Sequence, residues 1–125
     1  MTSILTNTRR PDISVNAAGR IDITARVARS LAMEPGDVID IAAEGREYYL
    51  YVRHKASNLR GRHVGQCFPT SRIGRGGSYR TWSVQLAAAI RAAAGTGELS
   101  LRLPCGEAVV INDKVYVPII MKCAL

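Results

Sequence analysis

The sequence predicts an α+β fold that is mostly β, arranged as a small barrel of two similar halves. Short runs of alternating apolar and polar residues predict strands, turn-forming residues separate these runs, and two stretches have helical spacing. Each half is expected to follow the order strand, strand, short helix, strand, strand, with pseudo-repeats at about residues 12–55 and 63–121. With 125 residues and 47% hydrophobic content the chain is sized for one core, so residues 1–125 are expected to form a single domain.

Two pairs of strands are expected in the first half. Residues 13–15 and 20–23 alternate in polarity, and residues 16–19 between them supply the turn of a hairpin. Residues 37–41 and 48–52 alternate in the same way and form the second pair.

A short helix is expected between these two pairs. Thr24 is placed to cap it, and Val27 and Leu31 stand one helical turn apart on an inward face. Pro35 and Gly36 stop the helix and reverse the chain into the next strand.

The second half repeats this order of elements. Residues 63–68 and 78–82 can form strands around a glycine-rich turn, and residues 86–94, rich in alanine, predict a helix that ends at Gly95. Leu86 and Ile90 in this helix repeat the four-residue spacing of the first helix, which predicts one shared core. The remaining strands are expected at residues 98–103, 108–111 and 115–121, with a hairpin turn at residues 112–113.

Charge is distributed unevenly along the chain. Residues 48–97 contain eight basic side chains and no Asp or Glu, whereas seven of the ten acids lie before this stretch. Arginine outnumbers lysine by fourteen to three, and its planar fork of donors matches phosphate oxygens and guanine edges. With a net charge of +7 and a pI of about 9.8, the chain is expected to bind nucleic acid or another polyanion, without a cofactor. Candidate contacts in the acid-free stretch are Arg53, Arg72, Arg75 and Arg80.

Residues 72–80 combine glycine, arginine and an aromatic. Such a loop lets the backbone approach phosphates and lets a ring stack on a base, but it lacks the Gly-Lys-Ser/Thr ending of a nucleotide-hydrolysing loop. Trp82 is expected to anchor the core rather than to stack. Tyr49 and Tyr51 share a strand face and are expected to pack rather than to meet bases.

Enzyme chemistry is not expected. Cys67, Cys105 and Cys123 are widely spaced and unpaired in pattern, so they are expected to be buried, reduced and free of metal. His54 and His63 lie among arginines without a nearby acid, which makes them poor general bases. A Cys67 thiolate with a lowered pKa is a remote alternative.

No targeting or membrane segment is evident. No apolar run approaches the ~18 residues that span a bilayer. The first ten residues lack the charged-then-apolar order of a secretory signal. Together with unpaired cysteines, these features predict a cytoplasmic protein with no membrane partner.

The stretch from Gly19 to Ile41 combines an alternating strand, a short helix and a Pro-Gly-Asp start to the next strand. The residues that form this pattern are Gly19, Arg20, Ile21, Ile23, Val27, Leu31, Pro35, Gly36, Asp37, Ile39 and Ile41. The pattern resembles the AbrB/SpoVT-type, or swapped-hairpin, DNA-binding domain family. The resemblance covers residues 12–52, and one departure is Thr24, where the family usually has proline.

The resemblance implies a duplex DNA-binding regulator, or an antitoxin-like factor, with no catalysis. Such domains are homodimers of interleaved hairpins, and a duplicated chain could supply both halves of the barrel itself. The contacts that the family implies here are Arg20 on a strand, Arg9 and Arg10 upstream of it, and Arg72, Arg75 and Arg80 in the second half.

Two alternatives stay open. The same barrel could be a structural or partner-binding module that does not touch nucleic acid, as a homodimer or with another protein. The first half also resembles the small barrel of pyruvoyl-dependent aspartate decarboxylase, which needs a Gly-Ser bond for self-cleavage. Gly77 and Ser78 stand at the equivalent place of the second half.

Overall fold

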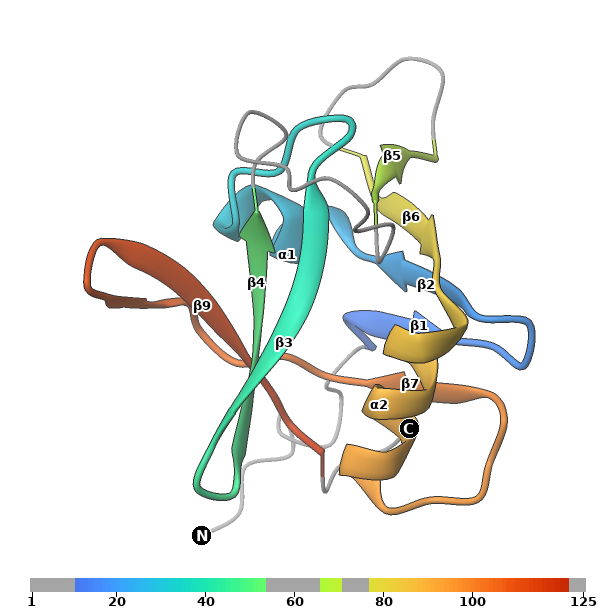
Figure 1. The fold of residues 1–125 in the computed structure, drawn as a ribbon. Coiled ribbons are helices and arrows are strands. Elements are labelled where there is room, and N and C mark those ends of the chain that lie inside the picture. The colour runs from blue at the N-terminus through green and yellow to red at the C-terminus, as the bar shows by residue number, and fades with distance from the viewer. Residues whose placement is uncertain (1–10, 54–65, 71–76, 122–125) are drawn as a thin grey trace, which may run out of the picture.

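A computed structural model describes residues 11–53, 66–70 and 77–121 of the chain. Within these ranges the chain is mostly β, with nine strands and two helices. The strands form two antiparallel sheets that pack face to face (Figure 1). The expected α+β class with a majority of β structure is therefore confirmed.

The first sheet, sheet A, contains strands from both halves of the sequence. Its order is β5-β6-β2-β1-β7, so the antiparallel pairing of β2 with β6 joins the two halves at its centre. The β1–β2 hairpin turns at Gly19, whose φ of +93° suits a residue without a Cβ. The strands are β1 (Ile13–Val15), β2 (Arg20–Ile23), β5 (Phe68–Pro69), β6 (Tyr79–Trp82) and β7 (Leu101–Leu103).

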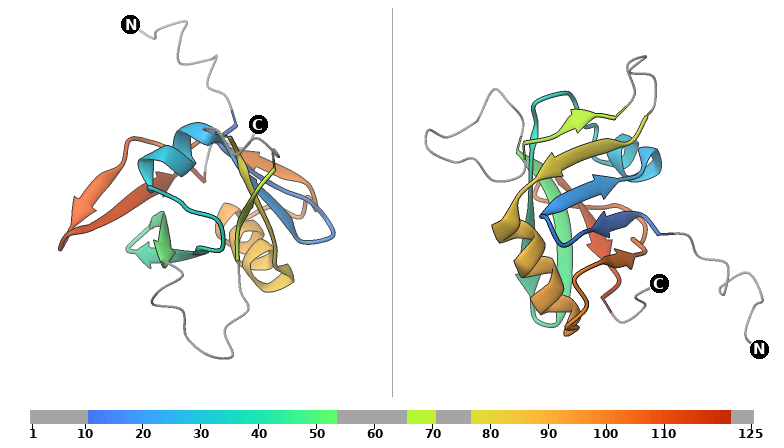
Figure 2. Two further views of the ribbon diagram at one scale, coloured as in Figure 1. Left: turned by 90° about the horizontal axis from the view of Figure 1, so that it is seen from above. Right: turned by 90° about the vertical axis from the view of Figure 1, so that its right-hand side faces the viewer.

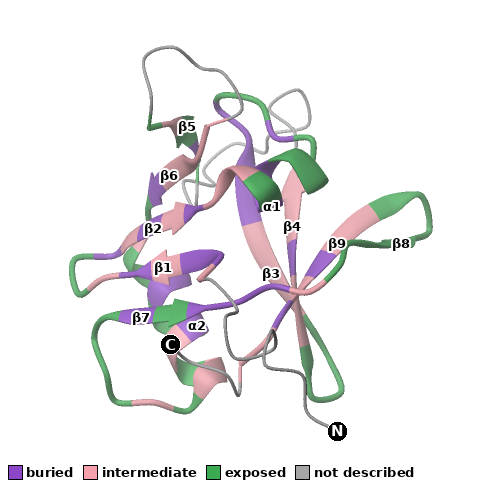
Figure 3. Ribbon diagram, turned by 180° about the vertical axis from the view of Figure 1, so that it is seen from behind, coloured by how far each residue is buried: buried purple, intermediate pink, exposed green. Residues whose placement is uncertain are grey.

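The second sheet, sheet B, has the order β3-β4-β9-β8. Asn112 and Asp113 both have positive φ angles, +52° and +66°, which form the predicted turn between β8 and β9. The tip of this hairpin projects from the body of the molecule, and β8 is exposed along its length (Figure 3). The strands are β3 (Val38–Glu44), β4 (Glu47–Arg53), β8 (Val109–Ile111) and β9 (Lys114–Ile119).

The two sheets do not close into a single barrel within the part of the chain that the structure describes. Two isolated bridges connect strands of sheet B to segments that flank strands of sheet A. Val38 of β3 bridges to Gln66, just before β5, and Ile119 of β9 bridges to Cys105, just after β7. Neither bridge extends into a ladder. Pro104 follows β7 directly and has no N–H to donate, which limits pairing at one of these junctions. The expectation of a closed barrel is corrected to two packed sheets.

Helix α1 (Ala25–Ser30) is shorter than the sequence predicts. Ala32 already has a φ of +52°, so the backbone leaves the helix before it reaches Pro35. Thr24 occupies the N-cap position but does not cap the helix through its side chain. Its hydroxyl instead donates to Asp12 Oδ1 at 3.2 Å, which corrects the capping prediction.

Helix α2 (Val84–Ala94) agrees with its prediction. Ser83 caps its start by accepting a hydrogen bond from the Leu86 amide at 3.1 Å, and Gly95 ends it in the left-handed conformation. Across the described ranges, neither helix has the length and apolar character needed to cross a membrane.

The core lies between the sheets and receives one face of each helix. The views in Figure 2 show α1 and α2 well apart from each other. Val27 from α1, Leu31 at the C-cap of α1, and Leu86 and Ile90 from α2 are nevertheless buried in the same apolar cluster, as predicted. Sheets A and B contribute Ile13, Ile21, Ile23, Leu103, Ile39, Leu50 and Val117 to it.

Candidate nucleic-acid interface

The outward face of sheet A collects polar and charged side chains. Because successive residues of a strand point to opposite faces, the neighbours of the buried apolar residues face solvent. The strand register places five of them in one row across the sheet. In spatial order these are Arg102 on β7, Ser14 on β1, Asp22 on β2, Arg80 on β6 and Phe68 on β5.

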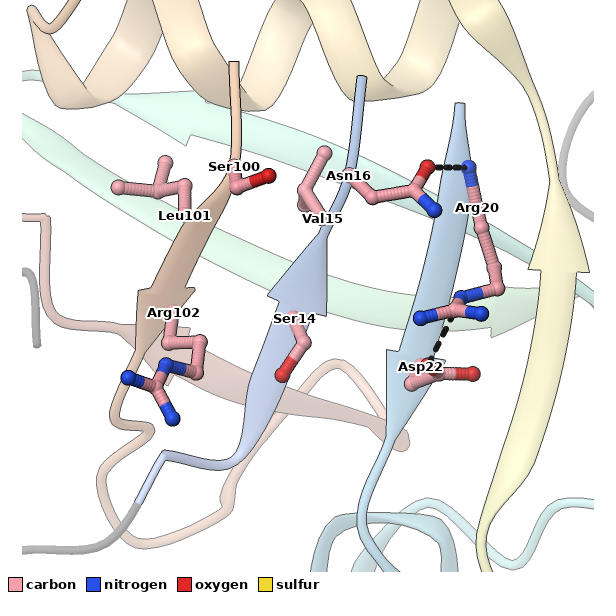
Figure 4. A pocket seen from close by; sticks show the side chains of 8 residues that line it. All are labelled: Ser14, Val15, Asn16, Arg20, Asp22, Ser100, Leu101 and Arg102. Atoms are coloured by element: carbon pink, nitrogen blue, oxygen red, sulfur yellow. Dashed lines mark hydrogen bonds and ion pairs between the residues drawn. The ribbon is translucent and has the colours of Figure 1, made fainter. Parts of the chain in front are cut away.

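A second row on the same face contains Arg20 opposite Trp82. Asn16 fixes the start of β2, because its side-chain oxygen accepts a hydrogen bond from the Arg20 amide at 2.8 Å. Between β7, β1 and β2 the two rows enclose a hollow of about 390 Å³, which Arg20, Asp22 and Arg102 line (Figure 4).

Asp22 holds two of the arginines. Its Oδ1 accepts a hydrogen bond from Arg80 Nε at 2.6 Å, and its Oδ2 lies 3.3 Å from Arg20 Nε. The hydrogen bond to Asp22 raises the pKa of Arg80, so this guanidinium stays charged. Arg20, Arg80 and Arg102 together face one carboxylate, which leaves these rows with a net charge of +2.

Two large aromatic side chains lie exposed beside these arginines. Trp82 is 58% exposed and Phe68 is 52% exposed. Both line a hollow of about 490 Å³, together with Arg80 and Gln66. The expectation that Trp82 anchors the core is wrong, because the alternation of β6 turns Thr81 inward and Trp82 outward.

Arg53 lies elsewhere. It belongs to β4 in sheet B, where its Nη2 is 3.4 Å from Asp40 Oδ2 and donates to the Tyr51 hydroxyl at 3.2 Å. The structure therefore brings Arg20 and Arg80 onto one face and leaves Arg53 off it.

The other predicted contacts, Arg9, Arg10, Arg72 and Arg75, lie outside the described residues, as do His54, His63 and Cys123.

Arg102 and Phe68 were not among the predicted site residues. Arg102 stands between two apolar residues of an alternating strand, a signal that would have placed it on the outward face. The charge pattern did not find it, because residue 102 lies beyond the acid-free stretch. Phe68 could be assigned only once β5 was paired with β6.

Tyr49 and Tyr51, which share a face of β4, pack against a neighbouring side chain as predicted. Tyr49 and Tyr51 both pack against Tyr116 of the neighbouring strand, with ring centroids 6.2 Å and 5.5 Å apart. These rings therefore stabilise sheet B by cross-strand contact.

Two cysteines of the described ranges, Cys67 and Cys105, are buried, as expected. Burial raises the pKa of each to about 12. For Cys67, desolvation outweighs the hydrogen bonds with the Ile39 backbone and the Thr81 side chain, which act to lower its pKa.

The fold and the outward face of sheet A together define a small two-sheet protein, in which one sheet surface carries basic and exposed aromatic side chains. No protein-family model, curated protein or solved structure matches the chain.

Proposed function

We propose that this protein binds nucleic acid through the outward face of sheet A, without catalysing a reaction. The observation that carries the proposal is the grouping of Arg20, Arg80 and Arg102 on one solvent-facing surface beside Trp82 and Phe68. A role as a transcription regulator or antitoxin-like factor, with duplex DNA as the polymer, is the setting that the family resemblance implies.

The arginine geometry supports phosphate binding. Arg20 and Arg80 meet Asp22 through Nε, so the two terminal nitrogens of each guanidinium are not used in those contacts. A guanidinium oriented by a carboxylate on one edge can present its other donors to a phosphate in a defined direction.

Arginine substitutions test the proposal. Binding to labelled DNA and RNA oligomers would be measured by fluorescence anisotropy across a salt series for the parent protein and for Arg102→Ala. Removal of one phosphate contact should weaken binding to all sequences and flatten the slope of log K against log salt by about 0.9 for duplex, or about 0.7 for single strand.

Arg46→Ala is the matched control. Arg46 is exposed in the β3–β4 turn of sheet B, so its removal changes the net charge equally without touching sheet A. If both variants lose the same affinity, only overall charge matters and sheet A is not the interface. If the parent protein binds no oligomer at low salt, the proposed function fails.

A partner-binding role is the second candidate, and the β8 edge favours it. β8 ends sheet B and exposes Val109, Val110 and Ile111. An exposed apolar edge strand can pair with a strand of another chain, and a second copy of this protein is the simplest such partner. Val110→Lys should then abolish self-association in sedimentation experiments and leave nucleic-acid affinity unchanged.

Duplication of one ancestral half is also part of the proposal. In sheet A the first half of the chain contributes β1 and β2, the second half contributes β5 and β6, and the two pairs of strands meet where β2 pairs with β6. This arrangement of equivalent strands supports the duplication.

The pyruvoyl-type decarboxylase remains a separate prediction, and a chain split between Gly77 and Ser78 in an intact-mass measurement would support it.

A further inference from the structure

We infer that the nucleic acid on this face is single-stranded, with bases stacked on Trp82 and Phe68. The inference rests on the proposed function and deepens it. It names the form of the polymer, a single strand in place of the duplex that the family resemblance implies, and the side chains that meet its bases.

The two rings are close neighbours on one surface. Phe68 pairs with Arg80, which is two residues from Trp82 along β6, so the rings stand in a diagonal relation across β5 and β6. Diagonal positions in an antiparallel pair are about 7–8 Å apart. Both rings line the same hollow, so one strand of nucleic acid could place neighbouring bases on them.

Two arginine side chains lie beside the rings. Arg80 lines the hollow with both aromatics, and Arg20 stands directly opposite Trp82 across the β2–β6 pair. Surfaces that bind single strands combine basic side chains that follow the backbone with rings that take the bases. An apolar protein partner would have to desolvate these guanidiniums, so the charge favours a polyanion with flat apolar groups.

The dimensions of sheet A disfavour base contacts with a duplex. Five strands spaced about 4.8 Å apart span roughly 19 Å, whereas the major groove of B-DNA is about 12 Å wide and admits a helix or two strands. A duplex could meet this face only through its phosphates, since its bases are already stacked on each other. A single strand can instead lie across the sheet with its bases turned toward the rings.

Trp82 is the only tryptophan in the chain, so its fluorescence reports on this face alone. The probes are a 12-mer of thymidylate, a 12-mer of uridylate, a DNA duplex of the same length and inorganic polyphosphate. Both single strands should quench the fluorescence on binding. Duplex and polyphosphate, which offer charge without free bases, should bind with little quenching.

Substitutions separate ring stacking from apolar character. Trp82→Leu and Phe68→Leu should each weaken single-strand binding by roughly 5- to 150-fold and change duplex binding by less than about 2-fold. Trp82→Phe keeps a ring and should retain most of the affinity. Leu99→Ala removes exposed apolar surface outside both rows of sheet A and serves as the control. Unchanged thermal unfolding would show that each variant is folded.

The outcomes separate this inference from the proposed function. If Arg102→Ala weakens binding while both leucine variants bind single strands normally and no probe quenches Trp82, the stacking inference is overturned and the interface remains. If no probe binds, both fail. Fluorescence that changes with protein concentration alone would make the ring surface a contact between copies and overturn the inference.

Discussion

At the scale of single residues, Asp12 connects three separate segments of the chain through one carboxylate. Its Oδ2 accepts hydrogen bonds from Arg26 Nη2 at 2.6 Å and from the Cys105 amide at 2.9 Å, and its Oδ1 accepts one from Thr24. Burial alone would raise the pKa of Asp12, but the hydrogen bonds from Arg26 and Cys105 outweigh it and hold the pKa below its ordinary value of 3.8. The charged form is therefore the one that stabilises the fold.

The first prediction concerns acid stability. A carboxyl with a lowered pKa in the folded state stabilises the fold above its ordinary pKa of 3.8, and this contribution is lost as the pH falls through the folded pKa. Asp12→Asn should lower the free energy of unfolding by about 1–3 kcal/mol at pH 7, and the difference should shrink toward pH 2. Urea unfolding at several pH values measures this, with the exposed Glu98→Gln as control. A difference that is constant with pH would contradict the role of the Asp12 charge.

The second prediction concerns the buried thiols. With a pKa of about 12, Cys67 and Cys105 should remain protonated and inaccessible at pH 8. A Cys123→Ser variant should therefore react with a thiol reagent only after unfolding. Rapid reaction of the folded variant would show that at least one of the two thiols is exposed or activated.

At the scale of elements, the turn between β1 and β2 packs against the start of α2. The Ser83 amide donates to the Gly19 carbonyl at 2.9 Å. A Cβ on Gly19 would lie 3.1 Å from the Val84 backbone nitrogen and 3.2 Å from the Ser83 carbonyl carbon, in addition to adopting a left-handed φ. Glycine is thus required both by the turn and by the approach of the helix.

The third prediction separates these two requirements. Gly45 also has a positive φ, but a Cβ there would meet no atom within 4 Å. Gly45→Ala should cost only the conformational term, about 1–2 kcal/mol. Gly19→Ala should cost roughly 1–3 kcal/mol more, because the backbone of α2 must move. Equal losses in urea unfolding would mean that the contact with α2 relaxes freely.

At the scale of the whole molecule, folding mixes charges that the sequence separates. Arg80 and Arg53 both come from the acid-free stretch, yet they pair with Asp22 and Asp40 from the acidic first half. The reason is strand pairing, since β2 aligns with β6 and β3 with β4. Sheet A keeps an excess of positive charge, but this excess is smaller than the distribution of charged residues along the sequence suggests.

The fourth prediction follows from this pairing. Asp22→Asn removes the one carboxylate among the charged residues of the two rows on sheet A. Because ion pairs at partly exposed positions are worth about 0–1 kcal/mol, loss of arginine orientation should matter less than the gain in positive charge. The variant should bind oligonucleotides more tightly, with a steeper salt dependence. Weaker binding in the same anisotropy assay would instead identify Asp22 as the group that orients both arginines.

The fifth prediction concerns the shared core. Val27 and Leu31 in one half and Leu86 and Ile90 in the other belong to a single cluster, so the halves should unfold together. Ile90→Ala should lower the free energy of unfolding by about 2–5 kcal/mol and shift circular dichroism and Trp82 fluorescence by the same amount. Two separate transitions would show that the halves are independent.

Alternation, turn residues and helical spacing in the sequence were enough to predict most of the described elements and the inward faces of both helices. Such features are local, because a residue's preference for strand, turn or helix face depends on its near neighbours. They also placed Arg20 and Arg80 within expected strands, at residues 20–23 and 78–82, which correspond to β2 and β6. The β7 strand is shorter than predicted, since the chain from residue 98 pairs with β1 only at Leu101–Leu103.

Only the tertiary structure decided which strands become neighbours, and the composition of the outward face of sheet A depends on which strands are neighbours. Trp82, Phe68 and Arg102 share a surface because β5, β6 and β7 join β1 and β2 in one sheet, a pairing between residues far apart in the chain. The carboxylates that hold the arginines, and the packing of two sheets in place of one closed barrel, depend on the same long-range contacts. Local preference cannot specify such contacts, because their free energy comes from surfaces that exist only once the chain has folded.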